Sequence, residues 1–107
     1  MVELVCGNIF VRPNPLAKAG DRVDGHTHNF DHTTYVVKGA VHVRGVCPDG
    51  RVIERDFSAG DFCLIKAEVI HTITALMDDT LFHCIYAHRT PQGDVVQEFT
   101  GWGAAYV

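Results

Sequence analysis

The sequence of 107 residues lacks long apolar runs, basic clusters and closely paired cysteines, and each absence excludes a class of protein. No apolar run approaches the roughly 18 to 20 residues that a membrane-spanning helix needs, so we expect no membrane span. The nine Lys and Arg residues are scattered singly and the net charge is −4, which argues against nucleic acid as a partner. The N-terminus has no basic segment followed by a long apolar one, so we expect no secretory signal and a cytoplasmic location.

Cysteine motifs for metal binding or redox chemistry are also missing. Cys6, Cys47, Cys63 and Cys84 are widely spaced, and no CxxC or CxH pair occurs. In a chain without an export signal we interpret them as reduced thiols packed as small apolar groups, with disulfides or thiolate ligands as the alternatives. There is no defensible serine or cysteine nucleophile arrangement and no glycine-rich phosphate loop.

Helical periodicity is not sustained over any window of three turns, whereas short β-rich runs closed by turns recur along the whole chain. Turn residues around Pro48-Asp49-Gly50 predict a hairpin. Many short strands in a chain of this length predict one all-β domain, a sandwich or small barrel. The expected strands are Leu4–Val11, Thr34–Val37, Ala40–Val46, Val52–Phe57, Phe62–Ile65, His71–Leu76, Leu81–His88 and Val95–Phe99.

Three histidines lie within one short span: His26, His28 and His32. A separation of four suits a helix, but the intervening Gly, Asn, Asp and Thr residues are weak helix formers. On a strand, residues two apart share a face and lie roughly 6.5 to 7 Å apart. Two such imidazoles can converge on one ion with bonds of about 2.0 to 2.2 Å, and a third can arrive from the next strand or the connecting turn. We therefore favour a metal site over exposed polar positions.

This stretch resembles the first motif of the cupin superfamily: a glycine, five residues, HxH, three or four residues, Glu, six residues and a glycine. Here Gly20 is followed by His26-Thr27-His28, His32 stands where the family usually has Glu, and Gly39 comes six residues later.

A degenerate second motif follows, in which the family has Pro-x-Gly, two residues, His, three residues and Asn. Lys66-Ala67-Glu68 replaces Pro-x-Gly and Ala75 replaces Asn, but His71 occupies the ligand position. The upstream Ser58–Asp61 segment resembles the turn that commonly precedes this motif. The resemblance therefore implies a single cupin domain over residues 1–107, a double-stranded β-helix (jelly-roll) barrel, with motifs at 20–39 and 58–75.

By the same resemblance, His26, His28 and His71 match the three histidine ligands of the family, and His32 replaces the carboxylate ligand. Asp31 is the alternative fourth ligand if the loop shifts by one residue. The implied cofactor is a divalent metal ion, Fe with Ni, Zn, Mn and Cu as alternatives. Four neutral imidazoles leave the ion its full positive charge, which favours an anionic oxygen ligand.

The leading functional hypothesis is an Fe-dependent, dioxygenase-like enzyme acting on a small oxygen-rich substrate, because four ligands on an octahedral ion leave two adjacent positions open. The alternatives are a non-catalytic metal- or small-molecule-binding module and a metal-dependent isomerase or lyase. Tyr86 and His88 could contact substrate or act as acid or base. Arg89 could pair with a substrate carboxylate or be solvated. The resemblance also implies a homodimer, often formed by exchange of terminal strands.

The remaining histidines and the tryptophan fall outside the motifs. His42 alternates with Val41 and Val43, so we expect it at the surface. His83 is opposite in phase to Phe82, Cys84, Tyr86 and His88, and the latter set is the better candidate for the interior. Trp102, between two glycines, is interpreted as a packing anchor or dimer contact.

Overall fold

The computed structural model describes residues 4–6 and 8–95, without the side chains of residues 4–6 and 26. Over these residues the chain forms nine β-strands and no helix, which confirms the all-β prediction. None of the described segments could therefore cross a membrane as a helix. The strands are β1 (Leu4–Cys6), β2 (Ile9–Leu16), β3 (Arg22–His26), β4 (His32–Lys38), β5 (Ala40–Val46), β6 (Val52–Ser58), β7 (Phe62–Ile65), β8 (Ile70–Ala75) and β9 (Thr80–Ala87).

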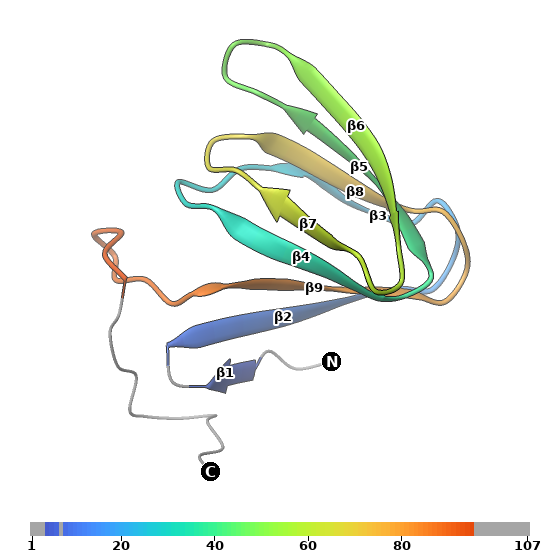
Figure 1. The fold of residues 1–107 in the computed structure, drawn as a ribbon, viewed down its shortest axis with the longest axis horizontal. Coiled ribbons are helices and arrows are strands. Elements are labelled where there is room, and N and C mark those ends of the chain that lie inside the picture. The colour runs from blue at the N-terminus through green and yellow to red at the C-terminus, as the bar shows by residue number, and fades with distance from the viewer. Residues whose placement is uncertain (1–3, 7, 96–107) are drawn as a thin grey trace.

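The strands form two antiparallel sheets that pack as a jelly-roll sandwich (Figure 1). One sheet has the order β1-β2-β9-β4-β7 and the other has the order β3-β8-β5-β6. Strands far apart in sequence are therefore neighbours, as β2 is with β9 and β3 with β8. At one side of the sandwich, β6 and β7 are the edge strands of their sheets.

The interior of the sandwich is apolar at one end and contains buried histidine side chains at the other. Along β4 the inward side chains run from His32 through Thr34 to Val36, and all three are buried. Along β8 the buried positions run from His71 to Ile73 and Ala75. Full burial of an aliphatic or aromatic side chain contributes about 1.5 to 3 kcal/mol, so the apolar end stabilises the scaffold that holds the rings. This core consists of Leu16, Val36, Val41, Val43, Cys63, Ile65, Ile73, Ala75 and Phe82.

The N-terminal prediction is wrong in its boundaries. The run Leu4–Val11, expected as one strand, is divided between β1 and β2, which pair with each other. β2 also continues through Pro13 and Pro15 to Leu16. Among the described residues β1 pairs with β2 only as far as Val11, so at Pro13 and Pro15 the described partner of β2 is β9. Proline is tolerated in a strand where its missing N–H is not needed by the ladder.

Elsewhere the strand predictions agree with the structure to within two residues at each end, with one omission. Strand β3 was not among the expected runs, because its five residues include Asp24 and Gly25. The hairpin around residues 47–51 is confirmed: Gly50 N–H donates to the Cys47 carbonyl, and Gly50 has a φ of 87°. Of the expected last strand only Val95 is described; it forms a bridge with Arg89. Trp102 lies outside the described residues.

Candidate metal centre

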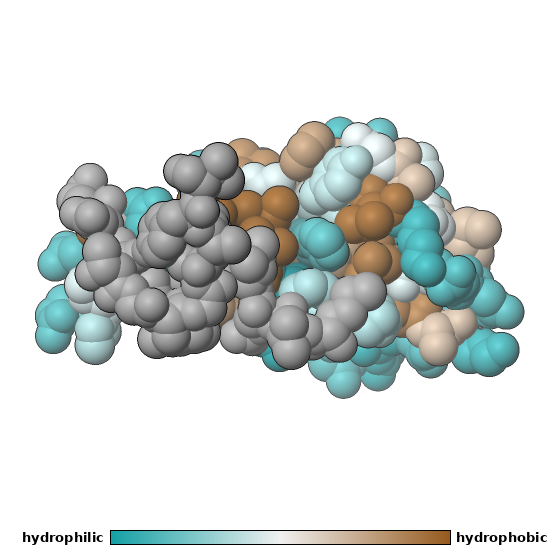
Figure 2. Space-filling view, turned by 90° about the horizontal axis from the view of Figure 1, so that it is seen from below, coloured by the Kyte–Doolittle hydropathy of each residue, from teal (hydrophilic) through white to brown (hydrophobic). Residues whose placement is uncertain are grey.

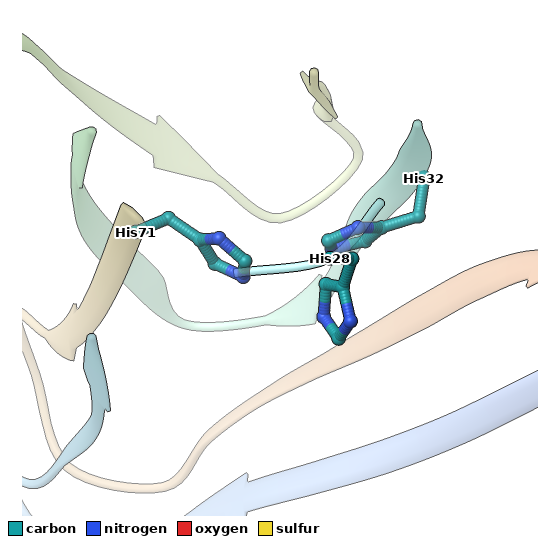
Figure 3. Close-up of side chains that lie close together, drawn as sticks. All are labelled: His28, His32 and His71. Atoms are coloured by element: carbon teal, nitrogen blue, oxygen red, sulfur yellow. The ribbon is translucent and has the colours of Figure 1, made fainter. Parts of the chain in front are cut away.

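Three histidine side chains converge between the two sheets, and they come from three different parts of the chain (Figure 3). His32 is the first residue of β4, His71 is the second residue of β8, and His28 lies in the connection between β3 and β4. His32 and His71 are 3% and 1% exposed, and His28 is half-buried. The cluster therefore joins both sheets and the segment between them.

The spacing of the rings suits one metal ion. The ring centroids lie 5.0 Å apart for His28 and His32, 5.6 Å for His28 and His71, and 5.2 Å for His32 and His71. One nitrogen from each ring lies within 4.8 Å of the other two. Bonds of about 2.0 to 2.2 Å place two nitrogens on one ion at most about 4.4 Å apart, so small ring rotations are sufficient.

His71 is held in an orientation that suits a ligand. Its Nδ1 lies 3.1 Å from the carbonyl oxygen of Val69. When Nδ1–H donates to that carbonyl, Nε2 carries no proton and its lone pair points outward as a metal ligand. Most metal-bound imidazoles have this arrangement. The donor set of buried neutral imidazoles therefore fits a divalent transition metal.

The other sequence-predicted ligands lie differently. The backbone of His26 pairs with His71 in the ladder between β3 and β8, which places this residue next to the cluster. Its side chain is outside the described part of the structure. His28 follows the end of β3, so the expectation that His26 and His28 share one strand is wrong.

Asp31 does not face the imidazoles but fastens the loop that leads into β8. Its carboxylate accepts hydrogen bonds from the Ala67 N–H at 2.7 Å and from Lys66 Nζ at 3.2 Å. These bonds hold the pKa of Asp31 below its usual value, the backbone bond from Ala67 contributing most. In addition, the Glu68 N–H donates to the carbonyl of His28 at 2.8 Å. Together these three contacts, which we name the loop latch, tie the His28 segment to the loop before His71.

Glu68 occupies the position where the second cupin motif has glycine, and its backbone keeps the conformation that glycine favours. Its φ is 66°, in the left-handed region that L-residues enter at a cost of roughly 1 to 2 kcal/mol. The degenerate motif has therefore lost the residue but not the turn. Strain of this kind persists where the surrounding contacts, here the loop latch, fix the backbone.

A cavity of about 350 Å³ opens beside the cluster, and all three histidines line it. Arg12 and Asn14 of β2 and Cys84 of β9 contribute to its wall, which the sequence alone did not reveal. Arg12 and Asn14 are two apart in an otherwise apolar segment, and that period of two was the available signal. Burial raises the pKa of the Cys84 thiol, which accepts a hydrogen bond from Asn14 Nδ2 at 3.7 Å.

The candidate substrate-contacting residues divide into two groups. Tyr86 lines the cavity, with its ring centroid 6.5 Å from that of His32, whereas His88 follows β9 and stacks on Phe10 outside the cavity wall. Arg89 is half-buried rather than fully solvated: its guanidinium lies 4.9 Å from the ring centroid of Phe30. The prediction that the Phe82 face of this strand points inward is confirmed for Phe82 and Tyr86.

His42 lies far from this chemistry, on the outer face of the four-stranded sheet, as the alternation with Val41 and Val43 predicts. Its ring lies between two carboxylates, 2.6 Å from Asp56 and 3.1 Å from Glu54. The hydrogen bond with Asp56, followed by that with Glu54, raises the pKa of His42 above its usual value of 6.5. Of the cysteines whose side chains the structure describes, Cys47, Cys63 and Cys84 are free thiols.

Comparison with known proteins gives matches only at the level of structure. No family model and no curated protein matches the sequence. The oxalate decarboxylase of Lactobacillus farciminis, solved as a formate complex, superposes with a TM-score of 0.69 at 23% identity, over 77% of this chain and 24% of its own. KdgF from Halomonas sp. also gives 0.69, at 22% identity, over 85% of this chain and 79% of its own. A Bacillus subtilis oxalate decarboxylase gives 0.69 at 20% identity, over 83% and 24%.

The protein has the cupin fold. The chain spans about a quarter of the oxalate decarboxylases but most of KdgF. At these identities the likeness is one of fold, and the chemistry of this chain has to be argued from its own residues. In this chain His28, His32 and His71 form a group that could bind a metal ion.

Proposed function

We propose that this cupin is a metal-dependent enzyme that acts on a small, oxygen-rich, anionic or enolisable substrate, with dioxygenase-like oxidation as the leading reaction class. His28, His32 and His71 would hold the ion, with His26 as the fourth ligand and Fe as the leading metal. The observation that carries the proposal is the convergence of three imidazoles from both sheets at the wall of a cavity.

The charges around the cavity favour an anion. Arg12 is the one charged side chain among the described residues that line it, and no Asp or Glu lines it. A divalent ion on neutral imidazoles would add further positive charge and act as a Lewis acid toward an anionic oxygen. Arg12, which lines the cavity from β2, would then orient the other end of the substrate.

Tyr86 supports a second candidate, a metal-dependent lyase or isomerase. Its phenol belongs to the cavity wall near His32, where it could donate or accept a proton during bond cleavage. Among the structural neighbours, the oxalate decarboxylases carry names that describe removal of a carboxyl group from a small dicarboxylate. A substrate of that kind would suit a cavity with one cation and no acid.

Oxygen consumption separates the two candidates. Protein loaded with Fe(II) under anaerobic conditions would be mixed with diketones, catechols and small dicarboxylates, with oxygen uptake and product formation measured in parallel. Uptake with one substrate class supports the dioxygenase-like reaction, and product formation without uptake supports the lyase or isomerase. Neither activity in metal-loaded protein would leave a non-catalytic binding module.

Arg12→Gln tests the anionic substrate class within the same assay. We expect an increase of about tenfold in KM for the anionic substrate, because one charge-assisted contact is lost, with the metal content unchanged. Arg22→Gln, on β3 and outside the cavity wall, is the matched control. Equal affinity of the metal-loaded protein for neutral and anionic analogues would contradict the anionic class. We also propose a cytoplasmic location and a homodimer. Gel filtration with light scattering tests the homodimer.

A further inference from the structure

A second hollow lies on the open side of the sandwich, between the edge strands β6 and β7. It has a volume of about 380 Å³ and shares only His71 with the histidine cavity. We name it the β6–β7 cleft. The residues that matter for its chemistry are Ile53, Arg55, Phe57, Phe62, Leu64 and Lys66.

Arg55 lies on the core-facing side of β6, at the open edge of the sandwich, where it lines the cleft and is exposed to solvent. In the pairing of β5 with β6, Arg55 stands opposite Val43, and Val43 is only 6% exposed. Directly opposed residues of an antiparallel pair share a face, so Arg55 points to the same side as the core residue Val43. Cys63 on β7 lines the same cleft from the facing edge strand.

The acidic residues of β6 cannot neutralise this charge. Glu54 and Asp56 lie on the opposite face, where they pair with His42. Within the part of the chain that the structure describes, Arg55 forms no ion pair, and no Asp or Glu lines the cleft. Lys66, at one end of the cleft, adds a second positive charge, although it is paired with Asp31.

Apolar side chains surround these cations, and they are exposed. Ile53 is 50% exposed, Phe62 is 64% exposed and Leu64 is 60% exposed. Phe62 is thus one of the most exposed apolar residues of the described chain. Figure 2 shows other apolar residues interspersed with hydrophilic ones on the face seen from below. In the β6–β7 cleft the combination is more specific: apolar walls around an unneutralised inward cation.

We propose that the β6–β7 cleft binds an apolar monocarboxylate of medium length. The carboxylate would pair with Arg55, and the hydrocarbon would cover Ile53, Phe57 and the rim residues Phe62 and Leu64. Burial of such a chain is favourable by about 0.8 kcal/mol per CH₂, and a volume near the lower end for ligand pockets limits the ligand to a small acid. The cleft touches the metal centre at His71, but the proposed ligand contacts lie on β6 and β7, and the proposal does not depend on the proposed function.

The test uses octanoate as the probe and the full-length, metal-free protein, so that coordination of the carboxylate to a metal cannot contribute. Titration followed by calorimetry and by amide NMR shifts should show binding, with the shifts centred on β6 and β7. Octanol, which has the chain without the charge, and acetate, which has the charge without the chain, should each bind at least tenfold more weakly.

Two variants locate the charge. Arg55→Gln should weaken octanoate binding about tenfold, whereas Arg44→Gln, on the opposite face of the same sheet, should leave it unchanged. Equal binding of octanol and octanoate, or equal effects of the two variants, would overturn the proposal. It would also be overturned if octanoate failed to bind and Arg55→Gln made the protein self-associate. That result would assign the inward cation to protection of an edge strand against pairing with another copy.

Discussion

His32 and His71 belong to different sheets, yet their ring centroids lie 5.2 Å apart in the interior of the sandwich. Both side chains are almost fully buried. A metal ion held by these two rings and His28 would therefore cross-link the two sheets at the end where the apolar core is absent. Binding and stability of the fold should then be coupled.

The first prediction concerns this coupling. Adding a divalent metal at a hundredfold excess over its Kd should stabilise the folded protein by about 2.7 kcal/mol, which raises Tm by roughly 10 °C in a domain of this size. Thermal unfolding followed by circular dichroism measures the shift. His32→Ala should abolish it, while His83→Ala, a half-buried histidine outside the cluster, should retain it. An equal shift in both variants would mean that the metal stabilises the protein elsewhere.

The second prediction concerns the loop latch. Asp31→Asn removes the charge that holds Ala67 and Lys66, and the loop before His71 should lose its fixed position. Metal affinity should fall by about tenfold, the lower end of the range for residues that orient ligands. The matched control is Asp49→Asn, because Asp49 also accepts a backbone N–H, that of Arg51, but in the distant β5–β6 turn. Competition with a chromogenic chelator measures the metal affinity of both variants. Equal affinities of Asp31→Asn and Asp49→Asn would count against the loop latch.

The third prediction concerns the backbone at Glu68. Glu68→Gly should stabilise the protein by up to about 1 kcal/mol, because relief of the left-handed conformation exceeds the extra entropy of the unfolded glycine chain. Glu68→Ala makes the same change of charge but keeps the Cβ, so it should give no such gain. Urea unfolding provides both free energies. If alanine stabilises as much as glycine, the side chain rather than the backbone is responsible.

The fourth prediction concerns pH and His42. Because Asp56 and Glu54 raise the pKa of this residue in the folded state, its stabilising contribution is complete below the ordinary value of 6.5 and is lost as the pH rises through the raised pKa. The difference in Tm between wild type and His42→Gln should therefore be largest near pH 5.5 and shrink toward about pH 8.5. A difference independent of pH would contradict this account.

Local patterns were sufficient to predict most of the fold. The alternation in Ala40–Val46 and the turn at Pro48-Asp49-Gly50 specify β5 and the hairpin, because both depend on neighbouring residues. The prediction of one N-terminal strand was wrong because the division into β1 and β2 depends on residues distant in sequence. Whether Pro13 lies in a strand depends on its pairing with His83 of β9, which is seventy residues away in the sequence.

The same distinction applies to the site. The spacing of His28 and His32, and the resemblance of the His71 segment to the second cupin motif, carried the prediction that these three residues meet, and the structure brings them together. Asp31 and His32 are adjacent in sequence, and only the position of the loop at Ala67 shows that the carboxylate turns away from the cluster. Arg12 lines the cavity because β2 pairs with β9, and this long-range pairing has no local sequence signal strong enough to predict it.

The most direct test of the central claim is the metal content and ligand environment of the protein, purified without chelator or affinity-column metal and then loaded with Fe(II) or Co(II). Elemental analysis should give about one ion per chain, and X-ray absorption should show imidazole nitrogens at about 2.0 to 2.2 Å. Alanine at His28, His32 or His71 should each remove most of the metal. If the three variants retain the metal content of the wild type, the histidine cluster is not a metal centre and the proposed function fails with it.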